Sequence, residues 1–321
     1  MFSTIDKNVT LPLIVVAGPT ASGKSALALR LAEEFRGAVV NADSMQVYRE
    51  LSILTARPKE TDIARIPHYI YGVRPIAEPC SAALWRDMAL EAIERVSDDE
   101  RFVILCGGTG LYIRALVEGI AQIPPVPGHV RALARSIHAR LGGAEFRAKL
   151  AERDPETAER LSDGDSQRLI RAWEVADATG RPISEWHRVS APHAATFRTF
   201  CIVLEPEREI LYKACDARFM QMIEQGLVKE VSALACLGLD SNLPGMKALG
   251  LPELMSYVRG EVDLETATAA AQQAIRRYAK RQITWFRHQI VPDMRLHAQF
   301  SESLEPKIFS KVRQFLLTGS S

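Results

Sequence analysis

Four short apolar runs along the chain predict buried strands. They are rich in Val, Ile and Leu and lack the alternation of polar residues that is typical of a half-exposed strand. Such runs indicate strands that are covered on both faces, as in a parallel sheet. The four runs are residues 13–17, 38–41, 102–106 and 199–204.

Helical periodicity follows the first of these runs and returns towards the C-terminus. Residues 25–35 have the spacing of an amphipathic helix, which we expect Gly37 to end, and long helical patterns reach Leu237 and then span residues 264–288. Strands that alternate with helices predict a three-layer α/β core with a parallel sheet.

The pattern changes between the third and fourth runs. Residues 123–128, IPPVPG, form a helix-breaking linker, and from Val130 to about Trp186 the chain is helical and charged. We therefore expect an α/β catalytic core from residues 1–123 and 199–321, with a helical insertion domain at residues 124–198.

Composition narrows the class of protein only slightly. The 321 residues hold 40 Lys and Arg against 39 Asp and Glu, a net charge of +1, which does not exclude a nucleic-acid partner because local clustering of charge matters more. The five cysteines have no CxxC or zinc-finger spacing and suggest reduced thiols. Without an apolar run long enough to span a bilayer or a secretory signal, we expect a cytoplasmic protein with no membrane contact.

A glycine-rich loop follows the first apolar run. The sequence GPTASGKS, residues 18–25, has the pattern of a phosphate-binding loop, and it stands between a predicted strand and a predicted helix, as that motif requires. Backbone N–H groups would point at phosphate oxygens, Lys24 would add a positive charge, and Ser25 would reach a bound Mg²⁺. The residues expected to bind the phosphates are Gly18, Pro19, Thr20, Ala21, Ser22, Gly23, Lys24 and Ser25.

Two further loops follow strands and are expected at the same edge of the sheet, where ligands of open α/β sheets bind. In the first, Asp43 fits a general base, a magnesium ligand or the cap of a following helix equally well, while Ser44 and Gln46 fit contacts to a base edge. In the second, GGTG, Thr109 fits either a ligand contact or a helix cap.

Taken together, these motifs resemble the tRNA dimethylallyltransferase family, also called tRNA isopentenyltransferases. The resemblance covers about residues 12–288 and rests on GPTASGKS, NADSMQVYR, GGTGLYIRALVEG, DSQRLIRAWEV with TGRPISEW, and AKRQITWFR, in that order. It implies a P-loop core and the transfer of a dimethylallyl group from dimethylallyl diphosphate to N6 of the adenosine 3′-adjacent to the anticodon, in tRNAs that read codons starting with U.

The resemblance also implies roles for single residues. Asp43 would be the general base, Thr109 would orient the reacting groups, and Lys24 and Arg218 would stabilise the diphosphate. From the pattern alone, Arg218 is a solvated helix residue. A monomer is expected, because one chain supplies every motif.

The family's tRNA contacts fall in the crevice loops, in the insertion and in a basic, aromatic segment near the C-terminus, where cations would meet phosphates and rings would stack on bases. For any single residue of that segment, a charged helix face over a core is the simpler interpretation. The predicted contacts are Asp43, Ser44, Met45, Gln46, Thr109, Arg131, Gln167, Arg168, Leu169, Ile170, Arg171, Lys280, Arg281, Gln282, Ile283, Thr284, Trp285, Phe286 and Arg287.

The chain departs from the family pattern at three places, all of which concern substrate binding more than the chemical step. Residues 162–165 are SDGD where the family has HPND, residues 54–58 are LTARP in place of GTAKP, and Leu251 replaces a tyrosine. Three alternatives remain: an adenylate isopentenyltransferase, a P-loop kinase of a small metabolite, and a non-catalytic RNA-binding descendant. The insertion and the KRQITWFR segment favour tRNA over a free nucleotide, and the intact Asp43 and Thr109 argue against decay.

Overall fold

The computed structural model describes residues 11–189 and 197–318 and divides the chain into two compact units. Unit 1 combines residues 1–117 with residues 194–321, and unit 2 is the segment between them, residues 118–193. Strand β5 begins at Phe197, so the last two residues of the expected insertion, 197 and 198, belong to the sheet of unit 1.

Unit 1 is built on a six-stranded parallel sheet in the order β3-β2-β4-β1-β5-β6. The α/β class expected from the apolar runs is therefore confirmed. The strands are β1 (Leu11–Ala17), β2 (Gly37–Asn41), β3 (His68–Tyr69), β4 (Phe102–Gly107), β5 (Phe197–Leu204) and β6 (Met294–Leu296).

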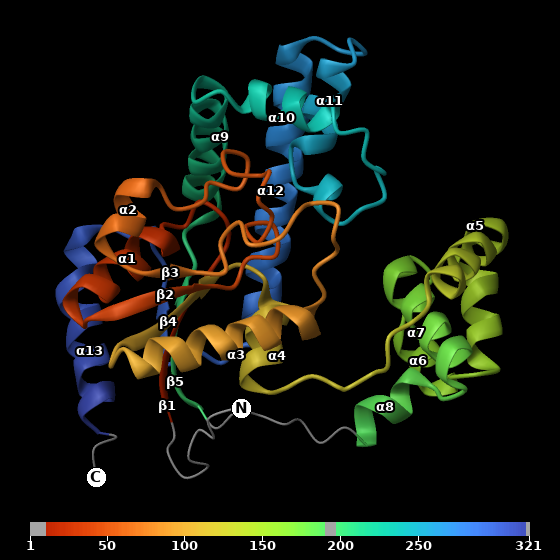
Figure 1. Ribbon diagram of the computed structural model, residues 1–321, viewed down its shortest axis with the longest axis horizontal. Coiled ribbons are helices and arrows are strands. Elements are labelled where there is room, and N and C mark those ends of the chain that lie inside the picture. Colours follow the sequence, from red (N-terminus) through yellow and green to blue (C-terminus); the bar gives the residue numbers. More distant parts are fainter. Residues whose placement is uncertain (1–10, 190–196, 319–321) are drawn as a thin grey trace. The chain divides into compact units, whose positions relative to one another are not determined.

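Helices cover both faces of this sheet, because successive side chains of a strand point to opposite sides. On one face, Ile14 and Val16 pack with α1 (Lys24–Glu34) and α13 (Glu305–Leu317), which lie together in Figure 1. On the other face, Leu13 and Val15 pack with α3 (Ala82–Asp98) and α4 (Gly110–Val117). A short helix, α2 (Glu60–Arg65), precedes β3.

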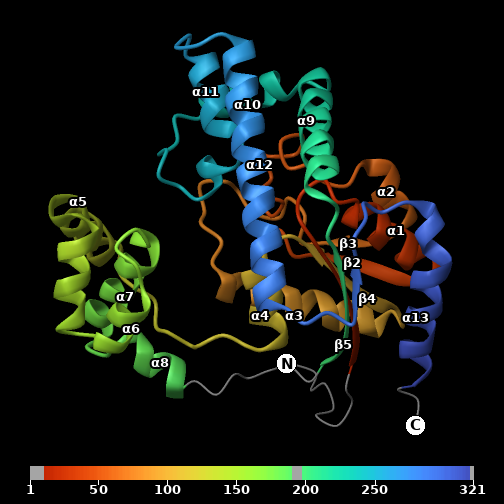
Figure 2. The ribbon, with the colours of Figure 1, turned by 180° about the vertical axis from the view of Figure 1, so that it is seen from behind.

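Four helices gather beyond the end of β5, where the chain leads into α9 (Figure 2). Contacts join α9 to α10 and α12, and α11 to both α10 and α12, so the four form one bundle. They are α9 (Arg208–Glu224), α10 (Leu227–Ala235), α11 (Leu251–Val258) and α12 (Leu264–Gln289). The 3₁₀ turns Gly245–Lys247 and Glu302–Leu304 precede α11 and α13.

The helix after the glycine-rich loop ends differently from our expectation. Helix α1 stops at Glu34, Arg36 takes the left-handed backbone conformation with φ 50°, and Gly37 is the first residue of β2. A Cβ at Gly37 would lie 2.8 Å from Cδ1 of Ile104 on the neighbouring strand. Close packing against the neighbouring strand and α1, rather than a helix cap, favours a glycine here.

In the described residues of unit 2, 118–189, the regular elements are all helices, and they enclose a core of their own. It contains α5 (Gly128–Ala151), α6 (Pro155–Arg160), α7 (Ser166–Thr179) and α8 (Ile183–Val189), and Phe146, Leu150 and Leu169 are completely buried among them. Helix α5 is kinked at Gly142, which has a non-helical backbone.

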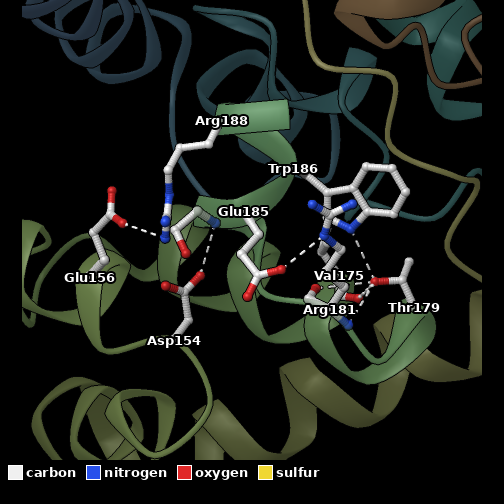
Figure 3. A network of polar contacts seen from close by, with 9 residues as sticks. Asp154, Glu156, Val175, Thr179, Arg181, Glu185, Trp186 and Arg188 are labelled. Carbon is white, nitrogen blue, oxygen red and sulfur yellow. Dashed lines mark hydrogen bonds and ion pairs between the residues drawn. The ribbon is translucent and has the colours of Figure 1, made fainter. Parts of the chain in front are cut away.

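A buried carboxylate joins two of these helices. Asp154, completely buried, accepts hydrogen bonds from the backbone N–H of Thr157 at 3.0 Å and of Ser184 at 3.1 Å. Its carboxylate is drawn in Figure 3. Burial alone would raise the pKa of Asp154, but these bonds outweigh it and lower the pKa. The carboxylate therefore remains charged and caps the N-terminal ends of α6 and α8 together.

No helix in residues 11–189 or 197–318 is long and apolar enough to cross a membrane.

Candidate active site

The glycine-rich loop connects β1 to α1 and is held by bonds from distant parts of unit 1. The backbone N–H of Thr20 donates to Oε1 of Gln282 on α12 at 2.9 Å, and Nε2 of Gln299 donates to the carbonyl of Ala21 at 3.0 Å. Gly23 has φ 87°, and a Cβ there would lie 2.8 Å from Cβ of Phe300. The loop conformation therefore depends on a glycine at this position.

Lys24 is almost buried at the start of α1. Its side chain is held in place by a 3.3 Å hydrogen bond from Nζ to the carbonyl of Pro19, and the residue is 8% exposed. Burial lowers the pKa of Lys24, while the negative charge of Asp43 opposes that effect. An ammonium group in this position is poorly solvated and would gain from an anion bound in the loop.

Asp43 follows β2 and faces the same cavity as Lys24. Its Oδ1 accepts from the backbone N–H of Met45 at 3.0 Å, and its own N–H donates to Oδ1 of Asn41 at 2.8 Å. The next helix begins only at Glu60, so the interpretation of Asp43 as a helix cap is wrong. A local turn instead fixes the carboxylate at the carboxyl edge of the sheet.

Thr109 connects the loop after β4 to the loop after β2. Its Oγ1 accepts from the backbone N–H of Ser44 at 2.9 Å and donates to Oγ of Ser44 at 3.3 Å. Thr109 stands at the start of α4, yet its hydroxyl bonds across to the other loop. The two loops that follow β2 and β4 are therefore one hydrogen-bonded assembly.

These groups surround a cavity of about 320 Å³ with a polar part and an apolar part. Its charged and hydroxyl groups include those of Lys24, Ser25, Asp43 and Arg218, and the guanidinium of Arg218 donates to Oγ1 of Thr20 at 3.3 Å. Burial lowers the pKa of Arg218, and Asp43 opposes this shift. The apolar walls are Leu54, Phe219, Met222, Ala248, Leu249 and Ile275.

Two residues that shape the cavity wall, Glu230 and Tyr278, are not predicted by any sequence motif. The carboxylate of Glu230 on α10 accepts from the N–H and Oγ of Ser52 and from the N–H groups of Ile53 and Leu54, at 2.7–3.0 Å. These bonds fix the segment that carries Leu54 into the cavity. Tyr278 of α12 also lines the cavity; burial raises the pKa of its hydroxyl, so the hydroxyl stays neutral at physiological pH. Neither residue belongs to a local motif.

Gln46, a predicted contact to a base edge, lines the same cavity as Asp43. Its Nε2 donates to the carbonyl of Thr55 at 2.8 Å. A bidentate pair with adenine needs both ends of the amide, and one end is already used here. In this structure Gln46 supports the wall of the cavity.

The KRQITWFR segment lies on α12 and splits into an exposed and a buried face. Lys280, Arg281 and Thr284 are exposed, and with Trp285 they line a second cavity of about 580 Å³. Arg287 is exposed but forms an ion pair with Glu205, and Ile283 is half-buried.

Two members of that segment face inward and correct our expectation of RNA contacts. Gln282 is 5% exposed with both ends of its amide hydrogen-bonded inside the protein, and Phe286 is 1% exposed. Gln282 and Phe286 are four residues apart, so they lie on the same face of α12. That face packs against the core, while the basic residues lie on the other face.

The candidate RNA contacts of unit 2 also separate by burial. Arg131, Gln167 and Arg168 are exposed, while Ile170 and Arg171 are half-buried. Leu169 is completely buried in the core of unit 2 and has no surface to offer RNA, which corrects the expectation for that residue.

Ser25 and Asp43 suit a magnesium ion bound together with phosphates. The Ser25 hydroxyl is exposed at the start of α1 and lines the cavity opposite Asp43. In residues 11–189 and 197–318, no three His, Cys, Asp or Glu side chains come together as a metal site. Mg²⁺ in phosphate sites takes only one or two protein ligands, so these two oxygen donors fit it.

The fold and this cavity define a P-loop-type α/β enzyme with an anion site beside an apolar site. A family model described as IPP transferase matches residues 46–289. The chain is 55% identical over 284 residues to a tRNA dimethylallyltransferase of Rhodospirillum centenum, covering 88% of this chain and 90% of that protein. It is 51% identical to one of Paramagnetospirillum magneticum, covering 97% and 99%.

Solved structures agree with these relatives. The tRNA isopentenylpyrophosphate transferase of Bacillus halodurans superposes with a TM-score of 0.70 at 29% identity, covering 96% of this chain and 98% of that one. A eukaryotic dimethylallyltransferase that acts on tRNA shares the fold, with a TM-score of 0.79 at 23% identity, covering 95% and 78%. The chain belongs to the IPP transferase family, which confirms the resemblance and the expectation of a prenyl-transferring enzyme.

Proposed function

We propose that this chain transfers a dimethylallyl group from dimethylallyl diphosphate to N6 of the adenosine 3′-adjacent to the anticodon, in tRNAs that read UNN codons, and releases diphosphate. The observation that carries the proposal is the divided cavity, in which the phosphate loop, Lys24 and Arg218 stand beside apolar walls. A diphosphate with a five-carbon tail matches both parts. A nucleoside triphosphate would leave the apolar walls without a partner.

The reaction forms a bond between N6 and C1 of the donor and breaks the bond between C1 and the diphosphate oxygen. The electron pair of the breaking bond leaves with the diphosphate, and the proton of N6 passes to the carboxylate of Asp43. Because the adenine amine is a weak nucleophile, a base held at the cavity raises the rate as the new bond forms. Thr109 keeps the loop of Asp43 and Ser44 in place through its bonds to Ser44.

Charge that builds on the leaving diphosphate is stabilised by groups that are already in position. Lys24 and Arg218 are held by their bonds to Pro19 and Thr20 before the ligand arrives, so little reorganisation is needed. Magnesium, held by the Ser25 hydroxyl, would neutralise further charge on the diphosphate.

The tRNA is expected to use the exposed residues of α12 and of unit 2. Lys280, Arg281 and Trp285 combine cations with an aromatic ring beside a second cavity, which suits an unstacked loop base and its phosphates. Arg131 and Arg168 would contact phosphates of the anticodon stem. The target adenine must leave its stack to reach Asp43. We expect a monomer that acts where tRNA is found, in the cytoplasm.

The direct test is transfer of label from radiolabelled dimethylallyl diphosphate, with Mg²⁺, to unmodified tRNA and to AMP in parallel. We expect label in tRNA at adenosine 37 alone, that is, at the residue 3′ of the anticodon, and none in tRNAs without an adenosine there. Label in AMP alone would assign the chain to the nucleotide-prenylating class. If neither tRNA nor AMP is labelled, the result would favour the alternative of a P-loop kinase whose loop binds ATP.

A further inference from the structure

The side chain of Gln282 lies where three parts of the active site meet. Its Oε1 accepts from the backbone N–H of Thr20 in the phosphate loop at 2.9 Å, and its Nε2 donates to the carbonyl of Gly108 in the loop after β4 at 2.9 Å. The residue itself belongs to α12 and is 5% exposed. One amide group therefore connects α12 to both loops.

The two partners allow a single orientation of this amide. A backbone N–H can only donate and a carbonyl can only accept, so the oxygen must face Thr20 and the nitrogen must face Gly108. The space for the amide is also reserved, because a Cβ at residue 108 would lie 2.3 Å from Nε2 of Gln282. A side chain of another length or charge cannot satisfy both loops.

Each of these two loops carries a different half of the reaction. Thr20 is bonded to Arg218 on the donor side through its Oγ1, and Gly108 immediately precedes Thr109, which holds Ser44 and the loop of Asp43 on the acceptor side. The distance between donor carbon and acceptor nitrogen thus depends on how these loops are spaced. Errors of about 1 Å in such spacing cost roughly 10²-fold in rate.

We propose that Gln282 is a positioning residue that sets the phosphate loop and the loop of Gly108–Thr109 at the spacing needed for prenyl transfer. This inference rests on the proposed function. It assigns to Gln282 a role inside the protein, although its neighbours Lys280, Arg281 and Thr284 are exposed for RNA. Alignment of the two loops, rather than affinity for tRNA, is what this side chain supplies.

The test compares Gln282→Met, which removes both bonds, with Gln282→Glu, which places a carboxylate against the carbonyl of Gly108. Gln273→Met is the matched control, because Gln273 is exposed on the same helix. We expect kcat to fall roughly 10- to 100-fold in both Gln282 variants. The Kd for tRNA, measured by filter binding, should change less than three-fold, and the control should match the parent protein.

A large rise in the Kd for tRNA with unchanged kcat would mean that Gln282 contacts RNA, and it would overturn the proposal. Two measurements do not depend on turnover. Binding of inorganic diphosphate, followed by calorimetry, should weaken about five-fold on loss of one ordering hydrogen bond. In the parent protein, the backbone N–H of Thr20 should be protected from hydrogen exchange by its bond to Gln282. Fast exchange would show that this hydrogen bond does not form, and it would overturn the proposal.

The same experiment separates the two proposals. If the parent protein prenylates no tRNA, the proposed function fails, while diphosphate affinity and Thr20 protection still decide whether Gln282 orders the loop. If the parent protein is active and the Gln282 variants keep full kcat and full diphosphate affinity, the proposed function stands and the positioning role is wrong.

Discussion

Lys24 shows how a single side chain sets the balance between stability and activity in this enzyme. It is 8% exposed, with a lowered pKa caused first by burial. In the unfolded chain the ammonium is fully hydrated and keeps its usual pKa of 10.5. The folded protein therefore bears a cost for charge at the anion site, and bound diphosphate relieves that cost.

Replacement of Lys24 by Met should abolish prenyl transfer and stabilise the ligand-free protein. An apolar side chain of similar length removes a buried charge, for which we expect a gain of about 1 kcal/mol at pH 7. Because the folded pKa lies below the unfolded one, the parent regains stability as the pH rises between the two values, and the difference from the variant narrows. Urea unfolding at pH 7 and pH 9.5 measures both effects; lower stability of the variant at pH 7 would contradict this account.

Replacement of Asp43 by Asn should separate chemistry from binding. The Asn side-chain oxygen can still accept from the N–H of Met45, as Asp43 does now, so the turn is kept while the base is lost. We expect kcat to fall about 10²- to 10⁴-fold, with the Kd values for tRNA and dimethylallyl diphosphate nearly unchanged. Single-turnover rates and filter binding supply these values. An equal loss of tRNA affinity would instead make Asp43 mainly an acceptor contact.

At this scale the sequence located the loops better than it located single contacts. Residues 18–25, Asp43 and Thr109 line or frame one cavity region, as expected from motifs that each follow a strand. The prediction that Gln282 and Phe286 contact RNA is wrong, because it rests on their place in a segment rich in Lys and Arg rather than on the helical face that they occupy. The spacing of Ala279, Gln282 and Phe286, at i, i+3 and i+7, is that of a buried helical face and could have shown that they point inward.

At the scale of the elements, the carboxylate of Glu205 joins helix α12 to β6, the edge strand of the sheet. Glu205, immediately after β5, is 5% exposed and accepts hydrogen bonds from Arg287 of α12 at 2.6 Å and from Arg295 of β6 at 2.5 Å. Burial would raise the pKa of Glu205, but the two arginines outweigh it and lower the pKa below 4.5. This attachment fixes the end of the helix that carries the exposed basic residues.

Replacement of Glu205 by Gln should lower the free energy of unfolding by about 1.5–3 kcal/mol at pH 7, the range for hydrogen bonds to charged groups. A depressed folded pKa gives stability that is present above about pH 4.5 and is lost as the pH falls through the folded pKa, so the difference between the proteins should shrink in acid. Urea unfolding at pH 7 and pH 3.5 tests this. The control is Glu91→Gln, an exposed change on α3; a constant difference at both pH values would refute the explanation.

Element length decided which strands could be predicted. Strands β1, β2, β4 and β5 are buried runs of five to eight residues and stood out in the sequence. Strands β3 and β6 have two and three residues, too few for any period to appear. They form because β2 and β5 offer unpaired edges, which only the assembled sheet reveals.

For the whole molecule, a net charge of +1 leaves exposed cations in both units, although Arg168 forms an ion pair with Asp165. Arg131 and Arg168 are exposed in unit 2, while Lys280 and Arg281 are exposed on α12 of unit 1. The sequence predicts an insertion at residues 124–198, whereas unit 2 spans residues 118–193, because the linker at residues 123–128 lies inside unit 2 and β5 begins at Phe197, ahead of its apolar part.

Replacement of both Arg131 and Arg168 by Gln should weaken tRNA binding and reduce its dependence on salt. Each phosphate contact contributes about 0.7 to 0.9 to the slope of log K against log salt concentration, so the loss of two contacts should reduce the magnitude of the slope by about 1.4 to 1.8. The KM for dimethylallyl diphosphate should not change. Binding titrations from 50 to 200 mM salt, with Lys311→Gln on α13 as control, test this; an unchanged slope would remove unit 2 from the RNA interface.

The position of β1 in the sheet has a consequence for how the protein emerges from the ribosome. Its two hydrogen-bonded neighbours are β4 and β5, so that Leu13 pairs with Val103 on one side and with Thr199 on the other. The first strand to be synthesised must wait for residues 197–204 before both its edges are covered. Unit 2, whose buried core lies wholly within residues 126–183, is complete earlier in translation. At about 5–20 residues per second, the edge of β1 that pairs with β5 stays open for roughly 9 to 37 seconds after β1 is made, and an open strand edge can pair with other chains during that time.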